Sequence, residues 1–233
     1  MYYHKAFFLL GGIFMNQTAA RLRRLTIMAL FTALAFIAVA FIRIPVMLWL
    51  SYEPKDVLLT IGAFLLGPIP GIVMTVLVAL LELVTISNTG LIGFVMNVFS
   101  SCLFVCTASI IYHRKRTLSG AIIGLIAAAL LATSGMLLWN YLITPLYMEN
   151  TTREQVAGML VPLFLPYNLL KSGLNAAFTM LLYKSVASAL RAAKLLPKVE
   201  NPTSAKRHLP VILLSLLVII ALVLAMLAWK GVI

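Results

Sequence analysis

Long apolar runs separated by short polar segments dominate the chain. A helix needs about 20 mostly apolar residues to cross the hydrocarbon core of a bilayer, at a rise of about 1.5 Å per residue. Runs that approach this length predict membrane-spanning α-helices, and they cover about residues 25–42, 72–86, 91–112, 118–143 and 166–190. They are too long and too uniformly apolar for the alternating pattern of outer-membrane strands.

Two more apolar segments complete the pattern. Residues 56–66 are short for a full crossing, and they end at residues 67–71, where two glycines and two prolines predict a sharp turn. A last run covers residues 209–229. We therefore expect an all-α integral membrane protein that consists of a six-helix bundle and one additional C-terminal transmembrane helix.

The same pattern divides the chain into four parts. We expect an N-terminal cytoplasmic or interfacial segment, a six-helix membrane domain, a basic cytoplasmic linker and the extra helix, over residues 1–24, 25–190, 191–208 and 209–233. Gly11 and Gly12 interrupt the first apolar residues. Residues 1–15 are therefore either a weak interfacial helix or a stretch that precedes the true start at Met15.

Composition supports a membrane protein, and the placement of charge predicts its orientation. The chain is 63% hydrophobic and 10% charged, which excludes an ordinary soluble domain. Its net charge is +12, and most of the Lys and Arg residues fall in clusters that precede the first span or lie between alternate spans, as is typical of cytoplasmic segments. We expect a multi-pass protein of an inner or plasma membrane with a cytoplasmic N-terminus. Polar stretches over residues 43–55 and 149–155 then predict loops on the outer side.

A polar stripe interrupts the last span of the six-helix domain. Asn168, Lys171, Ser172 and Asn175 lie three or four residues apart, so they share one helix face, and Thr179 extends it by a turn. A lysine at the bilayer centre costs about 2.5–3.5 kcal/mol, so it needs water, a partner or a ligand. Lys171 alone could lift its ammonium to the headgroups, whereas the asparagines cannot reach far. The stripe indicates a cavity open to the outside.

Two other spans carry matching polar groups. Asn140 lies near the outer end of the fifth span, with Thr144 one turn away, and Asn97 lies on a face of the fourth span with Ser100. Each set by itself could make hydrogen bonds between helices. Three sets near one surface favour a pocket for a neutral, planar ligand that is rich in hydrogen-bonding groups. Glu82 is a membrane carboxylate that either pairs with a buried donor, lies at the outer edge or serves as a proton or cation site.

The chain offers little for catalysis or for a metal. Its six acidic residues include none paired within a span, which argues against an enzyme such as a lipid-modifying transferase. Cys102 and Cys106 are four residues apart on one helix, a geometry that disfavours a disulfide. The histidines have no partner at ligand spacing, and no phosphate-binding Gly-x-x-x-x-Gly-Lys-Ser/Thr motif occurs. We expect no cofactor and no ATPase activity in this chain.

Residues 25–190 resemble a known family of membrane proteins. The resemblance rests on Lys55-Asp56-Val57, the turn over residues 89–93 that leads to Asn97, Leu138-Trp139-Asn140-Tyr141, and Pro166-Tyr167-Asn168-Leu169-Leu170-Lys171. These motifs resemble the substrate-binding S component of energy-coupling factor (ECF) vitamin transporters, in particular the riboflavin-specific type. The C-terminal helix is not part of the six-helix core of that family.

The resemblance implies a function and a set of site residues. Asn140, Asn168 and Lys171 would hydrogen-bond a flavin, and we add Asn97 and Asn175 as substrate-binding candidates from the polar faces. The loop over residues 43–55 would close over the pocket. An Ala-x-x-x-Ala face would dock the coupling transmembrane subunit, and it corresponds to Ala29 and Ala33.

The implied protein captures riboflavin, or a related vitamin, from outside and delivers it inward. Riboflavin is then the transported ligand, and ATP is hydrolysed by two cytoplasmic ATPase subunits that join the coupling subunit. The alternative is a stand-alone ion- or proton-coupled secondary transporter of a small polar metabolite, with Glu82 and Lys171 as coupling groups. That class usually contains internal repeats and discontinuous helices, which the sequence lacks.

Overall fold

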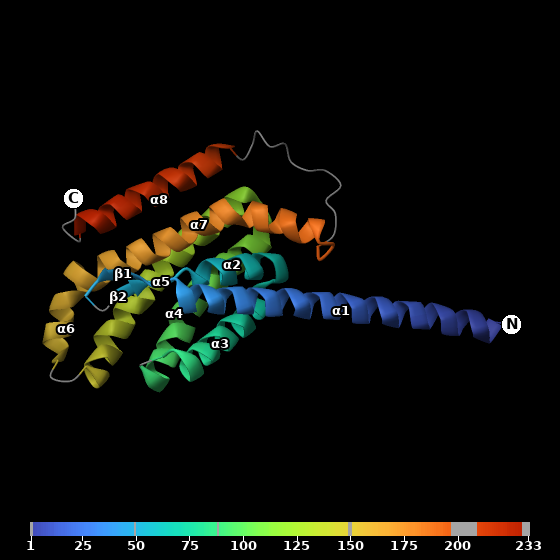
Figure 1. The fold of residues 1–233 in the computed structure, drawn as a ribbon, viewed down its shortest axis with the longest axis horizontal. Coiled ribbons are helices and arrows are strands. Elements are labelled where there is room, and N and C mark those ends of the chain that lie inside the picture. Colours follow the sequence, from blue (N-terminus) through green and yellow to red (C-terminus); the bar gives the residue numbers. More distant parts are fainter. Residues whose placement is uncertain (1, 49, 88, 149–150, 197–208, 230–233) are drawn as a thin grey trace.

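The chain folds into a helical bundle with one short β-hairpin (Figure 1). The structure is a computed structural model, and it describes every residue except 1, 49, 88, 149–150, 197–208 and 230–233. Most of the predicted linker over residues 191–208 therefore lies outside the described residues. The predicted all-α membrane fold is confirmed.

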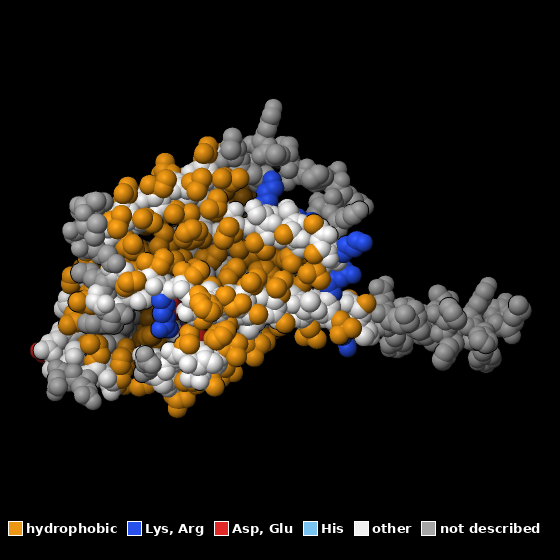
Figure 2. All heavy atoms as spheres, viewed as in Figure 1, with side chains coloured by type: hydrophobic (Ala, Val, Ile, Leu, Met, Phe, Trp, Pro, Cys, Tyr) orange, Lys and Arg blue, Asp and Glu red, His pale blue; other side chains and the backbone are white. Residues whose placement is uncertain are grey.

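The first helix is longer than the predicted span. Helix α1 runs without a break over Tyr2–Phe41, so no change of structure marks the predicted boundary at residue 24. The N-terminal half of α1 projects beyond the bundle (Figure 1). In Figure 2 most of the visible Lys and Arg side chains gather at the end of the bundle from which α1 projects.

A β-hairpin follows α1 where the sequence predicted a loop. Strands β1 (Ile44–Met47) and β2 (Leu50–Tyr52) pair antiparallel, with Ile44 opposite Tyr52. Leu48 in the connection has a φ of 47°, the left-handed conformation of a tight turn. Val46 and Tyr52 are buried in a cluster with residues of α7, which anchors the hairpin to the bundle.

Helices α2 (Lys55–Leu66) and α3 (Pro68–Thr85) are separated by Gly67 alone. The predicted turn over residues 67–71 is thus shorter than expected, because Pro68 already occupies the first turn of α3, where a missing N–H costs nothing. Gly67 has a φ of 109°, which a side chain would strain. Lys55, expected in the outer loop, instead begins α2, and both Lys55 and Asp56 are buried.

Helices α4 (Gly90–Lys115) and α5 (Leu118–Tyr147) match predicted spans and pack against each other. The expected loop over residues 149–155 ends earlier than predicted, because Thr152 and Gln155 form a capping box that starts α6 (Arg153–Met159). A π-helical turn, Leu160–Phe164, joins α6 to α7 (Leu165–Ala192). Pro162 and Pro166 lack backbone N–H groups in this region, which favours the wider turn.

The C-terminal helix α8 (Leu209–Trp229) packs against α7. Within the described residues, five helices are long and apolar enough to cross a membrane: the Thr18–Phe41 part of α1, α3, α4, α5 and the Pro210–Trp229 part of α8. The two other predicted spans are not among these five helices, for different reasons. Helix α2 has 12 residues, and α7 carries the polar stripe. Asn168, Ser172, Asn175 and Thr179 of that stripe are buried inside the bundle.

Candidate ligand-binding site

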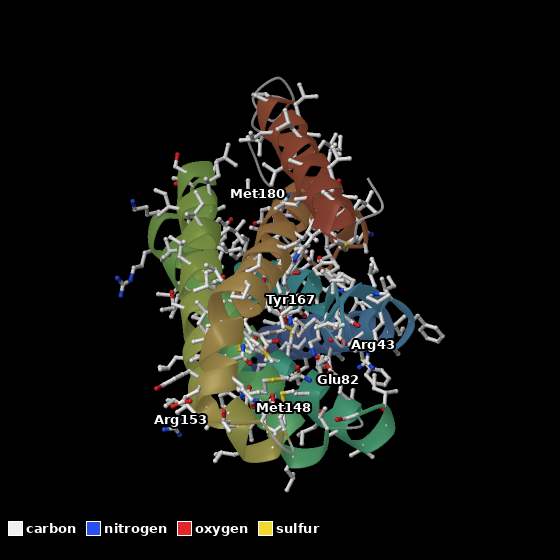
Figure 3. The ribbon with its side chains drawn as sticks, turned by 90° about the vertical axis from the view of Figure 1, so that its left-hand side faces the viewer. Arg43, Glu82, Met148, Arg153, Tyr167 and Met180 are labelled. Carbon is white, nitrogen blue, oxygen red and sulfur yellow. The ribbon has the colours of Figure 1, made fainter. Side chains whose placement is uncertain are left out.

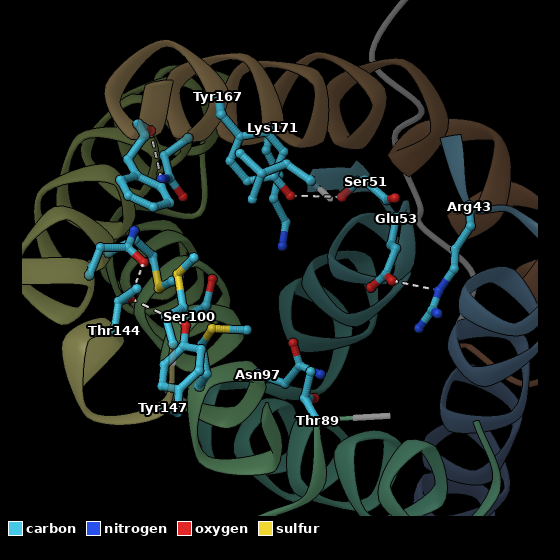
Figure 4. A pocket seen from close by; sticks show the side chains of 17 residues that line it. Arg43, Ser51, Glu53, Thr89, Asn97, Ser100, Thr144, Tyr147, Tyr167 and Lys171 are labelled. Carbon is cyan, nitrogen blue, oxygen red and sulfur yellow. Dashed lines mark hydrogen bonds and ion pairs between the residues drawn. The ribbon is translucent and has the colours of Figure 1, made fainter. Parts of the chain in front are cut away.

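A cavity of about 410 Å³ opens at the hairpin end of the bundle. Its walls come from the hairpin region, the start of α4, the end of α5 and the start of α7 (Figure 4). Figure 3 views the molecule from this end, with Arg43, Met148 and Tyr167 contributed by separate elements. The volume lies in the range of small-molecule sites, about 300–1,000 Å³.

Helix α7 supplies the wall that carries the polar stripe. The amide nitrogen of Asn168 donates to the Phe164 carbonyl oxygen at 2.7 Å, which leaves Oδ1 to accept from a ligand. Lys171 points into the open centre of the cavity in Figure 4. Its ammonium makes no hydrogen bond or ion pair with any described residue. The Lys171 ammonium is therefore a hydrogen-bond donor that a molecule in the cavity could contact.

Helix α5 supplies a second amide, Asn140, which presents its NH₂ group where Asn168 presents its oxygen. Asn140 is 5% exposed, and its Oδ1 accepts from the Thr144 hydroxyl at 3.1 Å. That hydroxyl also lies 3.2 Å from the Tyr147 hydroxyl. Because Oδ1 of Asn140 is occupied, its NH₂ group remains as the part of the amide that can donate to a ligand.

Helix α4 places Asn97 in the cavity and ties it to a buried ion pair. Asn97 donates from Nδ2 to Glu82 Oε2 at 2.9 Å. The Lys55 ammonium lies 2.6 and 2.8 Å from the two oxygens of the same carboxylate. Glu82 is thus a buried partner for donors, as one reading of the sequence proposed. A secondary transporter would need it free to exchange a proton or a cation.

The hairpin region forms the outer wall. Arg43 Nε and Glu53 Oε1 form a salt bridge at 2.9 Å, and both residues line the cavity. The Tyr167 hydroxyl donates to the Ser51 carbonyl oxygen at 2.7 Å. This bond joins the hairpin directly to α7 beside the cavity.

Apolar and aromatic side chains fill the space between the polar groups. They include three methionines and two aromatic residues: Met96, Met136, Met148, Tyr147 and Phe164. Flexible thioethers and aromatic faces pack well against a planar ring. The cavity therefore combines directed hydrogen bonding with surfaces that suit a flat ligand. Among the described residues, no group of three or more His, Cys, Asp or Glu could hold a metal ion.

The structure brings together four of the five predicted substrate-binding residues. Asn97, Asn140, Asn168 and Lys171 line the cavity. Asn175 is not among the lining residues: it accepts from the Tyr52 hydroxyl at 3.1 Å and donates to Asp56 Oδ2 at 3.3 Å. Asn175 and Asp56 are both 1% exposed, so this network lies within the core.

The two predicted docking residues lie elsewhere. Ala29 and Ala33 are exposed on α1, outside the cavity lining. Sequence reasoning missed Arg43, Glu53 and Tyr167 as lining residues. Tyr167 precedes Asn168 in the motif, so its position was a usable signal. Arg43 and Glu53 belong to the 43–55 segment that the family resemblance placed over the pocket, but nothing in the sequence singled out these two side chains.

A bundle of apolar helices with a polar cavity near one end is an arrangement that suits binding of a small molecule within a membrane. Residues 23–183 match the family described as ECF transporter, substrate-specific component, and the chain belongs to this family. The chain is 28% identical over 177 residues to the riboflavin transporter RibU of Staphylococcus aureus (strain TCH60), across 72% of this chain and 93% of the relative.

A solved structure supports the same assignment. The chain resembles the S component of a bacterial ECF transporter with a TM-score of 0.61 and 28% sequence identity, over 73% of this chain and 99% of that chain. The resemblance to the S component deduced from the sequence motifs is therefore confirmed. The matched family range ends at residue 183, before α8 begins.

Proposed function

We propose that this chain is the riboflavin-binding subunit of an ECF-type importer. The observation that carries the proposal is the hydrogen-bonding character of three cavity side chains. Asn140 offers an NH₂ donor, Asn168 offers a carbonyl acceptor and Lys171 offers an ammonium donor. The orientation of each asparagine amide follows from the hydrogen bond that its other end makes within the chain: Asn140 Oδ1 with Thr144, and Asn168 Nδ2 with the Phe164 carbonyl oxygen.

The flavin ring carries a complementary edge. Its pyrimidine part presents an N–H group between two carbonyl oxygens, so the sequence of groups is acceptor, donor, acceptor. The ammonium and the Asn140 amide can donate to the two carbonyl oxygens, while Asn168 Oδ1 accepts from the N–H. The methionine and aromatic side chains of the cavity would cover the faces of the ring. One relative that matches this chain is a riboflavin transporter, which supports the same ligand.

The distribution of charge supports uptake from the hairpin side. Basic residues in the middle of α1 and in the last turns of α4 and α7, such as Arg24, Arg114 and Arg191, belong to clusters typical of cytoplasmic segments. The cavity opens at the hairpin end, away from the projecting part of α1 (Figure 1). In this orientation the N-terminus is cytoplasmic in a bacterial plasma membrane, and the cavity receives ligand from outside.

Inward delivery then depends on partners. The chain lacks a phosphate-binding Gly-x-x-x-x-Gly-Lys-Ser/Thr motif, so two cytoplasmic ATPase subunits would supply energy through a coupling transmembrane subunit. The exposed Ala29 and Ala33 would let a helix of the coupling subunit approach α1 closely.

The direct test is binding by the purified, full-length protein in detergent. We expect yellow flavin to co-purify, and we expect the ligand-free protein to quench the fluorescence of added riboflavin at stoichiometric concentrations. Thiamine and biotin serve as competitor controls and should leave the titration unchanged. Absence of riboflavin binding, or binding no tighter than that of the other vitamins, would contradict the proposed ligand.

A further inference from the structure

The Glu82 carboxylate lies in the bundle with three hydrogen-bond contacts to two donor groups. Lys55 Nζ contacts both oxygens, and Asn97 Nδ2 contacts Oε2. The side chains of Lys55 and Glu82 are each 2% exposed. A buried pair of charges is costly to desolvate and is retained without penalty only when its remaining groups are well bonded. The pair therefore calls for an explanation beyond packing.

The consequence of the pair appears at Asn97. Because the amide nitrogen is committed to Glu82, the other end of the Asn97 amide, Oδ1, is the group available to the cavity that Asn97 lines. A carboxylate only accepts hydrogen bonds, so the amide cannot turn over without placing two oxygens together. Glu82 thus determines that Asn97 is an acceptor.

The surroundings of Asn97 differ from the wall that carries Asn168. In Figure 4, Asn97 and Thr89 lie across the cavity from Tyr167 and Lys171, with Glu53 and Arg43 at the side. The neighbouring groups are a hydroxyl, a carboxylate and a guanidinium, all from lining residues. Such groups suit several alcohol hydroxyls better than a flat ring, since each hydroxyl both donates and accepts.

We propose that Glu82 is a positioning residue that fixes the Asn97 carbonyl as an acceptor for a hydroxyl of the ligand's polyol chain. This inference rests on the proposed function, because riboflavin joins such a chain to the ring whose edge faces Asn140 and Asn168. Lys55 balances the charge of Glu82. Lys55 Nζ also lies 3.6 Å from Glu53 Oε2, and Glu53 forms a salt bridge with Arg43. A chain of ion pairs therefore connects Glu82 to the hairpin region.

The experiment compares riboflavin with lumiflavin, which has the same ring edge but a methyl group in place of the polyol chain. Affinities are measured by fluorescence titration for the wild type, Asn97→Ala, Glu82→Gln and the double variant. We expect each single change to weaken riboflavin binding about three- to tenfold, which is the effect of losing one hydrogen bond. Lumiflavin affinity should change less than about twofold. Asn168→Ala is the matched control and should weaken both ligands.

The double variant separates positioning from general structural damage. If Glu82 acts through Asn97, Glu82→Gln should weaken riboflavin binding by less than about twofold further once Asn97 is alanine. Additive losses, or equal losses for the two flavins, would overturn the inference and leave Glu82 a structural residue. If the wild type binds neither flavin, the proposed function fails instead, so the two failures are distinguishable.

A second variant covers the case in which Glu82→Gln does not fold because it leaves Lys55 unbalanced. Lys55→Gln combined with Glu82→Gln removes both charges and keeps the side-chain sizes. It should fold, because neither position 55 nor position 82 is left with an unbalanced buried charge. We expect this variant to lose the preference for riboflavin over lumiflavin. Retention of the full preference would contradict the role of Glu82.

Discussion

Gly173 on α7 lies directly against Leu222 on α8: a Cβ atom at position 173 would lie 2.9 Å from Leu222 Cδ1. The glycine therefore lets α8 approach the helix that carries Asn168 and Lys171. We expect Gly173→Leu to force α8 away from α7 and to lower the melting temperature in detergent. Gly158→Leu is the control, because a Cβ there meets nothing within 4 Å. Equal losses for both variants would mean that the α7–α8 contact is unimportant.

Removal of α8 tests what this contact does for the cavity. Ile219, Leu222, Met226 and Trp229 pack against a cluster that includes Val46 and Tyr52 of the hairpin and Tyr167 of α7. Helix α8 thus supports both the hairpin and the α7 wall. We expect a chain that ends at residue 208 to release riboflavin faster in stopped-flow dilution. Association should change less, because α8 supplies no cavity-lining residue among those described. An unchanged dissociation rate would show that the six-helix core holds the hairpin unaided.

Lys171→Met tests the unpaired ammonium. Methionine keeps much of the side-chain length and suits an apolar environment, so the protein should remain folded. A hydrogen bond from a charged donor contributes about 1.5–3 kcal/mol, which corresponds to roughly 10- to 100-fold weaker riboflavin binding. Titration of purified protein measures the change, and the amount of protein extracted reports folding. Unchanged affinity at normal yield would mean that the ammonium only reaches toward the headgroups.

The sequence predicted the helices and much of the cavity because both leave local signals. Apolar runs predict spans, and polar residues inside such runs are rare enough to mark Asn140, Asn168 and Lys171. The hairpin left a weaker signal, since four- and three-residue strands resemble a loop. The Lys55–Glu82 pair could not be predicted, because 27 residues separate its members and only packing of α2 on α3 brings them together.

The exposed face of α1 makes a prediction about transport rather than binding. Ala29 and Ala33 are four residues apart and exposed, so larger side chains there would keep a partner helix at a distance. We expect Ala29→Leu with Ala33→Leu to retain riboflavin affinity in detergent but to reduce uptake in cells that contain the ATPase and coupling subunits. Val84→Leu provides the control, because Val84 is 82% exposed near the end of a different helix, α3. Loss of binding in the alanine variant would point to misfolding instead of failed docking.

Asn175 and Asn168 occupy the same stripe of α7 but should respond differently to removal of their amides. The Asn175 amide joins Tyr52 of the hairpin to Asp56 of α2, and Asp56 also accepts from Ser101 of α4 at 2.6 Å. Asn175→Ala would leave the Tyr52 hydroxyl and the Asp56 carboxylate short of a partner in the core, at about 1–3 kcal/mol for each such group. We therefore expect a lower melting temperature without ligand, and any loss of affinity should be shared by riboflavin and lumiflavin.

Asn168→Ala removes an acceptor in the cavity, so it should weaken flavin binding while the ligand-free melting temperature changes little. If Asn175→Ala instead weakens binding as much as Asn168→Ala with no loss of stability, Asn175 contacts the ligand after all, and the cavity must extend deeper along α7 when riboflavin is bound.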